Sequence, residues 1–269
     1  MGTPATPAPL SESAVVTRLR AAGCVFAEDE ARLLMSTART PGELSAMVDR
    51  RAAGLPLEHV LGWAEFCGLR IAVDPGVFVP RRRTEFLVRQ AIAIAPACPV
   101  IVDLCCGTGA VGAALAAALD GAELHATDID PAAVRCARRN VAPAGGHVYA
   151  GDLFEPLPAA LHGRVDILAA NVPYVPAGEV GLLPPEARLH EPRAALDGGG
   201  DGLDVLRRVT AEARRWLAEG GTLLTEISER QEQAACDTAR RGGLVPRVAR
   251  SAEFGATVIV ATRPAGLQG

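Results

Sequence analysis

The chain has 269 residues, 49% of them hydrophobic, and a formal net charge of −4. This length allows one core of about 150–200 residues with a smaller second unit, and no apolar run reaches the roughly 18 residues of a membrane span. An acidic chain without a broad basic stripe also lacks the electrostatic footprint of a protein that binds duplex nucleic acid.

Cysteine usage and the amino-terminal residues predict a cytoplasmic protein. The seven cysteines form neither a CxxC pair nor a Cys/His ligand pattern, so we expect reduced thiols and no metal site. No basic segment followed by an apolar one begins the chain, so we expect no signal peptide. We also expect a monomer without membrane association or stably bound nucleic acid.

The first 80 residues are predicted to precede the main domain. Residues 1–9 are rich in Pro, Thr and Ala, and we expect a disordered tail there. Residues 10–53 have apolar side chains at helical spacing and predict a small helical domain, whose third helix has Thr40 as its cap and Pro41 at its first position. Glycine and proline interrupt residues 54–80, which we interpret as a linker containing a β-hairpin.

Strands and helices alternate from residue 100 onward, and this predicts a mostly parallel sheet with helices on both faces in a domain of residues 81–269. The expected strands are 100–104, 123–127, 147–150, 165–170, 222–227 and two short pieces near 244–248 and 257–261. The expected helices are 110–119, 131–140, 203–218 and 230–241. Gly220 and Gly221 are predicted to end the third of these helices.

A glycine-containing loop follows the first expected strand. It reads Asp103-Leu104-Cys105-Cys106-Gly107-Thr108-Gly109, and its glycines allow a tight turn and a close approach of backbone to a ligand. Alone it is weak evidence for a nucleotide site.

The next two strand ends strengthen that interpretation. Asp128 ends the second strand, where a carboxylate can accept both hydroxyls of a ribose. Asp152 and Leu153 follow the third strand, where an adenine ring could lie. Acids rather than basic residues at these ends disfavour a phosphate-rich ligand, so we expect a positively charged cofactor with a ribose and an adenine, S-adenosylmethionine.

The fourth strand end reads Asn171-Val172-Pro173-Tyr174. Pro173 cannot donate to a sheet ladder and keeps Val172 extended, so the strand ends here and displays Asn171 and Tyr174 at its carboxyl end. The amide oxygen of Asn171 and the carbonyl of Val172 could accept both hydrogens of a planar NH2 group. The sequence therefore predicts a site for a carboxamide or for the exocyclic amine of a base. Residues 176–202, a long Pro- and Gly-rich excursion, follow this motif, and a loop of that length beside a site is usually functional.

With these motifs, the chain resembles the HemK/PrmC family of protein-(glutamine-N5) methyltransferases. The resemblance covers about residues 31–231 and is carried by segments 50–62, 78–85, 190–203 and 226–227 beside the NVPY motif. Departures from the family pattern suggest a divergent branch, among them Cys105-Cys106 in the glycine loop and a short helical domain. Val172 stands where the family pattern NPPY has its first proline, and Arg82-Arg83 replace the usual proline and acid.

The resemblance implies a class I S-adenosylmethionine-dependent methyltransferase fold, Rossmann-like and seven-stranded, behind a helical domain that helps to recognise a protein. It implies methylation of the GGQ glutamine of peptide-chain release factors, with Asn171, Val172, Pro173 and Tyr174 forming the catalytic slot. We expect the cofactor to contact Phe78, Arg81, Asp103, Cys105, Gly107, Thr108, Gly109, Asp128, Ile129, Asp152, Leu153 and Asn171.

Other functions share parts of this pattern. An adenine N6 amine is chemically similar to an amide, so a methyltransferase acting on rRNA or DNA is the nearest alternative, although we would expect it to have a basic recognition surface or a larger target domain. A small-molecule N-methyltransferase is a second alternative. A homologue that binds the cofactor without catalysis is a third.

Overall fold

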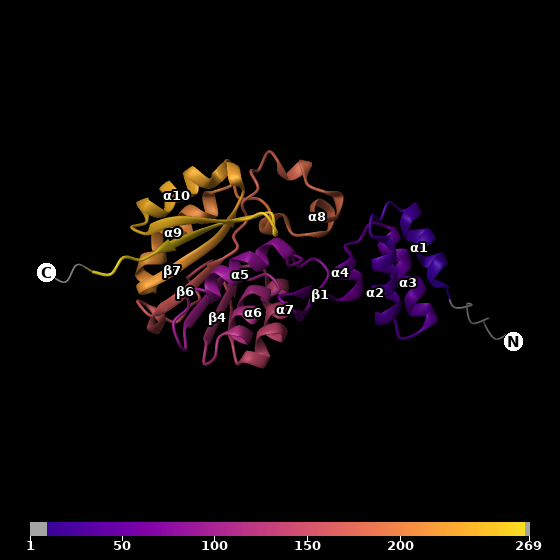
Figure 1. Cartoon of the computed structure of the whole chain (residues 1–269), viewed down its shortest axis with the longest axis horizontal. Coiled ribbons are helices and arrows are strands. Elements are labelled where there is room, and N and C mark those ends of the chain that lie inside the picture. The colour runs from indigo at the N-terminus through magenta and orange to yellow at the C-terminus, as the bar shows by residue number, and fades with distance from the viewer. Residues whose placement is uncertain (1–9, 267–269) are drawn as a thin grey trace.

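A computed structural model describes residues 10–266 of the chain. The tail expected at residues 1–9 lies outside the described residues. A bundle of helices at the amino-terminal end lies beside a larger α/β body, and a short helix and a hairpin connect the two (Figure 1). No helix within residues 10–266 is long and apolar enough to cross a membrane.

Three helices form the bundle: α1 (Glu12–Ala21), α2 (Ala27–Thr37) and α3 (Pro41–Ala52). The hydroxyl of Thr40 accepts a hydrogen bond from the Glu43 amide at 3.1 Å, and Pro41 occupies the first turn, so α3 begins as its sequence predicts. The bundle has a hydrophobic core of its own, whose buried members are Val15, Leu19, Ala27, Ala31, Leu34, Leu44, Met47, Val48 and Val60.

Arg51, at the end of α3, connects the bundle to the body. Its buried guanidinium forms two hydrogen bonds to the Glu30 carboxylate of α2, at 2.6 and 3.0 Å, and a third to the Leu55 carbonyl at 2.8 Å. The same guanidinium donates to Glu186 at 2.5 Å. Glu186 belongs to α8 (Pro185–His190), within the excursion that follows the NVPY motif.

The connection consists of α4 (Leu57–Leu61) and the antiparallel hairpin of β1 (Trp63–Phe66) and β2 (Leu69–Ala72). His59 on α4 is buried, and its Nε2 donates to the Val77 carbonyl at 2.8 Å. This bond fixes the start of the segment that leads to Phe78 and Arg81.

The body is built on a seven-stranded sheet in the order β5-β4-β3-β6-β7-β9-β8. Its strands are β3 (Val100–Leu104), β4 (Glu123–Asp128), β5 (His147–Ala150), β6 (Val165–Ala170), β7 (Leu217–Ile227), β8 (Val245–Ser251) and β9 (Ala256–Thr262). The strands from β5 to β7 are parallel, and β9 and β8 are antiparallel additions at one edge. The predicted seven-stranded, mostly parallel α/β fold is thus confirmed.

Helices cover both faces of this sheet (Figure 1). One face carries α5 (Glu85–Ile92), α6 (Ala110–Ala118) and α7 (Pro131–Val141), and the other carries α9 (Asp204–Trp216) and α10 (Glu232–Arg241). Single 3-10 turns link the elements: η1 (Arg82–Thr84), η2 (Ala142–Ala144), η3 (Ala159–Leu161), η4 (Val180–Leu182), η5 (Arg193–Ala195) and η6 (Glu229–Gln231).

The predicted end of α9 is wrong. The helix ends at Trp216, and Gly220 and Gly221 lie within β7, where the pairing register with β6 shifts. A Cβ on Gly221 would lie 2.5 Å from the Val165 carbonyl oxygen, so glycine is needed because β6 approaches closely at the bulge.

Candidate active site

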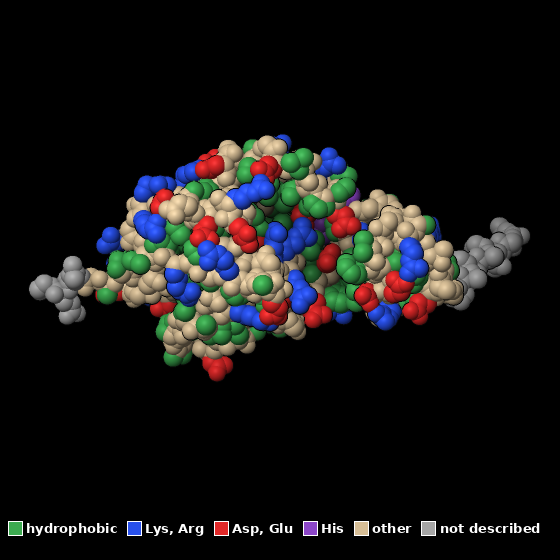
Figure 2. Space-filling model, turned by 45° about the horizontal axis from the view of Figure 1, so that its top comes forward, with side chains coloured by type: hydrophobic (Ala, Val, Ile, Leu, Met, Phe, Trp, Pro, Cys, Tyr) green, Lys and Arg blue, Asp and Glu red, His purple; other side chains and the backbone are tan. Residues whose placement is uncertain are grey.

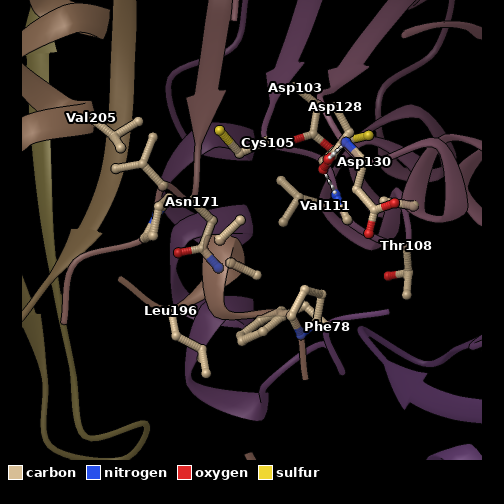
Figure 3. Close-up of a pocket in the computed structure, with 18 of the residues that line it drawn as sticks. Phe78, Asp103, Cys105, Thr108, Val111, Asp128, Asp130, Asn171, Leu196 and Val205 are labelled. Atoms are coloured by element: carbon tan, nitrogen blue, oxygen red, sulfur yellow. Dashed lines mark hydrogen bonds between the residues drawn. The ribbon is translucent and has the colours of Figure 1, made fainter. Parts of the chain in front are cut away.

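The carboxyl ends of β3, β4 and β6 meet around a cavity of about 360 Å³, together with residues that follow β5. Figure 3 shows that side chains from these different strand ends point into one space. Figure 2 shows a hollow in the surface, with basic side chains beside it. All of the expected site residues line this cavity except Gly109: Phe78, Arg81, Asp103, Cys105, Gly107, Thr108, Asp128, Ile129, Asp152, Leu153, Asn171, Val172, Pro173 and Tyr174.

The loop after β3 holds the carboxylate of Asp128 in place. Gly107 has a φ of +56°, which favours glycine, and its N–H donates to Asp128 Oδ2 at 2.8 Å. The other oxygen, Oδ1, accepts from the Asp130 amide at 2.9 Å. Two backbone donors therefore orient this carboxylate beside the cavity.

Gly109 has a different part in the structure from the one we expected. Its φ is +75°, and a Cβ there would lie 3.1 Å from the Ala137 Cβ and 3.2 Å from Val141 Cγ1. The residue lets the start of α6 pack closely against α7 and does not line the cavity. Sequence spacing alone does not separate a packing glycine from a ligand-binding glycine.

Asp103 is buried at the end of β3 and faces the cavity. Its Oδ2 accepts a hydrogen bond from the Gly112 amide at 2.9 Å. Burial, opposed by that bond and reinforced by the nearby Asp128 carboxylate, raises the pKa of Asp103 to about 7. A cationic ligand group placed here would favour the ionised carboxylate.

The two cysteines of the loop differ in surroundings. Cys105 has a positive φ of 55°, and its sulfur lies at the wall of the cavity (Figure 3). Cys106 is buried and packs against Ala126 and Ala137. Burial and the neighbouring carboxylates raise the pKa of both thiols, so neither is set up as a thiolate nucleophile.

Two apolar side chains and the ion pair of Asp152 with Arg208 complete the region expected to hold the adenine. Ile129 follows β4 and lines the cavity with 63% of its surface exposed. Asp152 accepts from Arg208 of α9 at 2.6 Å, and Leu153 beside it is buried. The hydroxyl of Thr127, at the end of β4, is buried without a hydrogen-bond partner in the part of the chain that the structure describes.

Asn171 stands at the carboxyl end of β6. Its amide extends into the part of the cavity that Phe78 and Leu196 also line (Figure 3). Among residues 10–266, no protein group forms a hydrogen bond with this side chain. Its oxygen is therefore free to accept a hydrogen bond from a ligand.

The residues after Asn171 are fixed from several directions. Val172 is only 2% exposed and packs into the core beneath α9. The Val175 amide donates to Leu196 O at 3.1 Å, and the Gly198 amide donates to Val175 O at 2.8 Å, so the 176–202 excursion pairs with the motif. Gly198 is required here, because a Cβ would lie 2.6 Å from the Pro173 carbonyl oxygen.

Tyr174 is held by residues from β7 and η6. Its hydroxyl donates to Glu226 Oε1 at 2.6 Å, and its carbonyl accepts from Gln231 Nε2 at 2.8 Å. Burial and the Glu226 charge raise the pKa of the Tyr174 hydroxyl, so it remains a neutral donor. Glu226 is not among the site residues that the sequence predicted; its signal in the sequence is an acid near the end of the mostly apolar run 222–227.

Phe78 and Arg81 form the wall opposite the strand ends. The Arg81 guanidinium lies 5.0 Å from the Phe78 ring centroid and pairs with both oxygens of the buried Glu191 carboxylate, at 2.7 and 2.6 Å. Glu191 also accepts from the Val79 amide at 3.1 Å. Segments 78–81 and 190–192, distant in the sequence, thus form one wall of the cavity.

The residues of the cavity fit the expected cofactor. Six acids line it, Asp103, Asp128, Asp130, Asp152, Asp197 and Glu226, whereas its three arginines, Arg81, Arg83 and Arg208, are each paired with an acid. This balance suits a ligand with cationic groups and ribose hydroxyls better than a phosphate. The exposed Ile129 and the unpartnered Thr127 hydroxyl are further groups that a bound ligand would cover.

Comparisons with known proteins agree with this geometry. Residues 68–203 match the family model "Methyltransferase small domain". The chain is 39% identical to a release factor glutamine methyltransferase of Geobacter sulfurreducens over 76% of this chain and 72% of that one, and 42% identical to one of Mycolicibacterium smegmatis over 74% and 72%. It is 39% identical to a 4-amino-L-phenylalanine/4-methylamino-L-phenylalanine methyltransferase of Streptomyces pristinaespiralis over 66% and 63%.

A solved structure gives the same fold. The crystal structure of a methyltransferase from Pyrococcus furiosus superposes with a TM-score of 0.55, at 16% identity, over 82% of this chain and 98% of that one.

Proposed function

The chain belongs to the release factor glutamine methyltransferase family, and we propose that it transfers a methyl group from S-adenosylmethionine to the side-chain amide nitrogen of a protein glutamine. The expected acceptor is the GGQ glutamine of a peptide-chain release factor. The observation that carries this proposal is the amide of Asn171, displayed in the cavity at the end of β6 and free of protein partners among the described residues.

S-adenosylmethionine is the cofactor of this family fold, and when bound it supplies an electrophilic methyl group on a sulfonium. Asp103 would face its cationic part and Asp128 its ribose, while Ile129 and Leu153 would flank the adenine. Gly107, Thr108 and Cys105 would form the floor of this part of the cavity.

The amide of a glutamine is a poor nucleophile because its nitrogen lone pair is delocalised. We propose that Asn171 Oδ1 and the Val172 carbonyl accept the two hydrogens of the carboxamide and so fix the direction in which its nitrogen faces. Both bonds strengthen as the nitrogen gains positive charge, so they stabilise the transition state more than the ground state. Pro173 and Tyr174 would shape the slot, and the nitrogen would release one proton to water or to Asn171.

Further parts of the proposal concern the whole chain. We propose that the bundle of residues 10–53 contacts the protein substrate and that the chain acts as a monomer without stably bound nucleic acid. Since the substrate is a translation factor, we place the activity in the cytoplasm. Light scattering of the purified chain measures its oligomeric state, and with a release factor it measures whether the two form a complex.

The central experiment incubates the chain with a methyl-labelled cofactor and separately purified release factors. We expect mass analysis to place one methyl group on the glutamine of the GGQ peptide. A release factor with that glutamine replaced by alanine is the matched control and should take no label. Parallel reactions contain rRNA or 4-amino-L-phenylalanine. Label in either of these, without label in the release factor, would overturn the proposed substrate.

A further inference from the structure

One carboxylate at the cavity, that of Glu226, has no part in the chemistry described so far. Glu226 lies near the carboxyl end of β7, lines the cavity and is 2% exposed. Two side chains donate hydrogen bonds to it, Tyr174 Oη at 2.6 Å to Oε1 and Thr84 Oγ1 at 2.7 Å to Oε2. Arg83 forms an ion pair with it, with Nε 2.7 Å from Oε1. Both oxygens are therefore engaged by groups on other segments of the chain.

These contacts immobilise Tyr174 at its two ends. Glu226 binds the hydroxyl at the tip of the ring, and Gln231 binds the backbone carbonyl. The hydroxyl lies on the axis of the Cβ–Cγ bond, so fixing both the tip and the backbone fixes where the ring stands, although the ring can still turn about that axis. Tyr174 follows Asn171 by three residues and lines the same cavity, so the position of this ring sets one wall beside the Asn171 amide.

The charge of Glu226 has a defined partner. A buried carboxylate is costly unless it is paired, and Arg83 is the cation that pairs with it. The Arg83 side chain is 48% exposed, and its guanidinium carbon lies 5.7 Å from the Tyr174 ring centroid. Arg83 thus neutralises Glu226 from the solvent side without displacing the Tyr174 hydroxyl.

We propose that Glu226 is a positioning residue, which holds the Tyr174 ring as a fixed wall of the acceptor slot, with Arg83 as its counter-ion. The proposal rests on the proposed function for the identity of the acceptor. Glu226 acts through Tyr174 and touches neither the cofactor nor the acceptor in this scheme. Its loss should therefore lower turnover and leave cofactor binding unchanged.

The first test is a cycle of Glu226→Gln, Tyr174→Phe and the double variant, assayed with a release factor. We expect each single variant to lower kcat by about tenfold, in the range of a misplaced catalytic group, and the double variant to be no worse than the single ones within about twofold. The Kd for S-adenosylmethionine should change by less than about twofold. Glu229→Gln is the matched control, since Glu229 is exposed on η6 and three residues away.

The cycle separates positioning from a general role in the fold. Effects on kcat that multiply in the double variant, or a parallel loss of cofactor affinity, would overturn the proposal. Activity of Glu226→Gln equal to that of the parent chain would do the same.

A second measurement does not depend on the acceptor. The chain has two tyrosines, Tyr149 and Tyr174, so ring-labelled tyrosine gives two sets of NMR signals. In Glu226→Gln we expect the Tyr174 signals to shift because the ring leaves its position, while those of Tyr149 stay unchanged. Unchanged Tyr174 signals would refute the positioning role. If the parent chain fails to methylate release factors, the proposed function fails, and this measurement still decides the role of Glu226.

Discussion

Replacing Asn171 with alanine should affect catalysis without affecting the stability of the fold. In the proposed mechanism the substitution removes one of the two acceptors that orient the amide nitrogen. Loss of a single preorganised hydrogen-bonding group at a reacting centre costs about 2.7–4 kcal/mol, or a factor of about 10²–10³ in turnover. We therefore expect kcat to fall by at least about 100-fold.

The structure predicts that this loss leaves stability almost unchanged. The Asn171 side chain is half-buried and forms no hydrogen bond within residues 10–266, so alanine leaves no protein group unpaired. The free energy of unfolding should change by no more than about 0.5 kcal/mol. The Kd for S-adenosylmethionine should also stay within a few-fold, because the cofactor is expected to lie mainly against other strand ends.

Asn140 is the contrasting control. Its side chain accepts from the Ala72 amide at 2.9 Å and donates to the Ala72 and Thr108 carbonyls, at 2.9 and 2.8 Å. Asn140→Ala should lower the free energy of unfolding by about 2–4 kcal/mol, since it removes three hydrogen bonds at about 0.5–1.5 kcal/mol each. Urea unfolding and labelled-methyl turnover measure both variants. Full activity of Asn171→Ala, or a loss explained by unfolding, would refute the mechanism.

Three further changes test other parts of the structure. The pKa of about 7 for Asp103 lies above its unfolded value, so this acid favours the fold at low pH and loses that contribution as pH rises toward 7. A cationic cofactor prefers the ionised form of Asp103, so its affinity, measured by calorimetry, should be about tenfold weaker at pH 6 than at pH 8. Asp103→Asn should abolish this pH dependence of the affinity. Gly109→Ala puts a side chain on a residue with positive φ and places its Cβ 3.1 Å from the Ala137 Cβ. The free energy of unfolding measured in urea should fall by about 1–3 kcal/mol. An unchanged stability would refute the packing role of this glycine. Arg51→Met leaves Glu30 as an unpaired buried charge and should lower the free energy of unfolding by about 3–5 kcal/mol. Adding Glu30→Gln should recover part of that loss, and equal stability of the single and double variants would contradict this account.

Much of the fold could be predicted because the sheet follows local patterns. Each strand from β3 to β6 is short and has an acid or amide within two residues of its carboxyl end, and parallel strands place those ends at one edge. Asp103, Asp128, Asp152 and Asn171 could therefore be assigned to one cavity in chain order. The structure brings all four together around it.

The remaining errors arise where distant segments decide the geometry. Gly221 is required by the Val165 carbonyl of another strand, and Gly109 by Ala137 on another helix. The pairing of Glu226 with Tyr174 joins residues 52 positions apart, and no local pattern reports such a contact. Val172 is similar, because core packing secures it where the family pattern has a proline, and this packing depends on tertiary structure.

The contacts of Arg51 constrain how the bundle can vary among relatives. One guanidinium satisfies an acid of the bundle, Glu30, and an acid of the excursion, Glu186. A substitution at any of these three positions leaves charge unbalanced at the other two, so the three should co-vary across the family. Exchanging the bundle between two relatives should succeed only when the incoming α2 and α3 bring a charge pattern that matches the residue at 186.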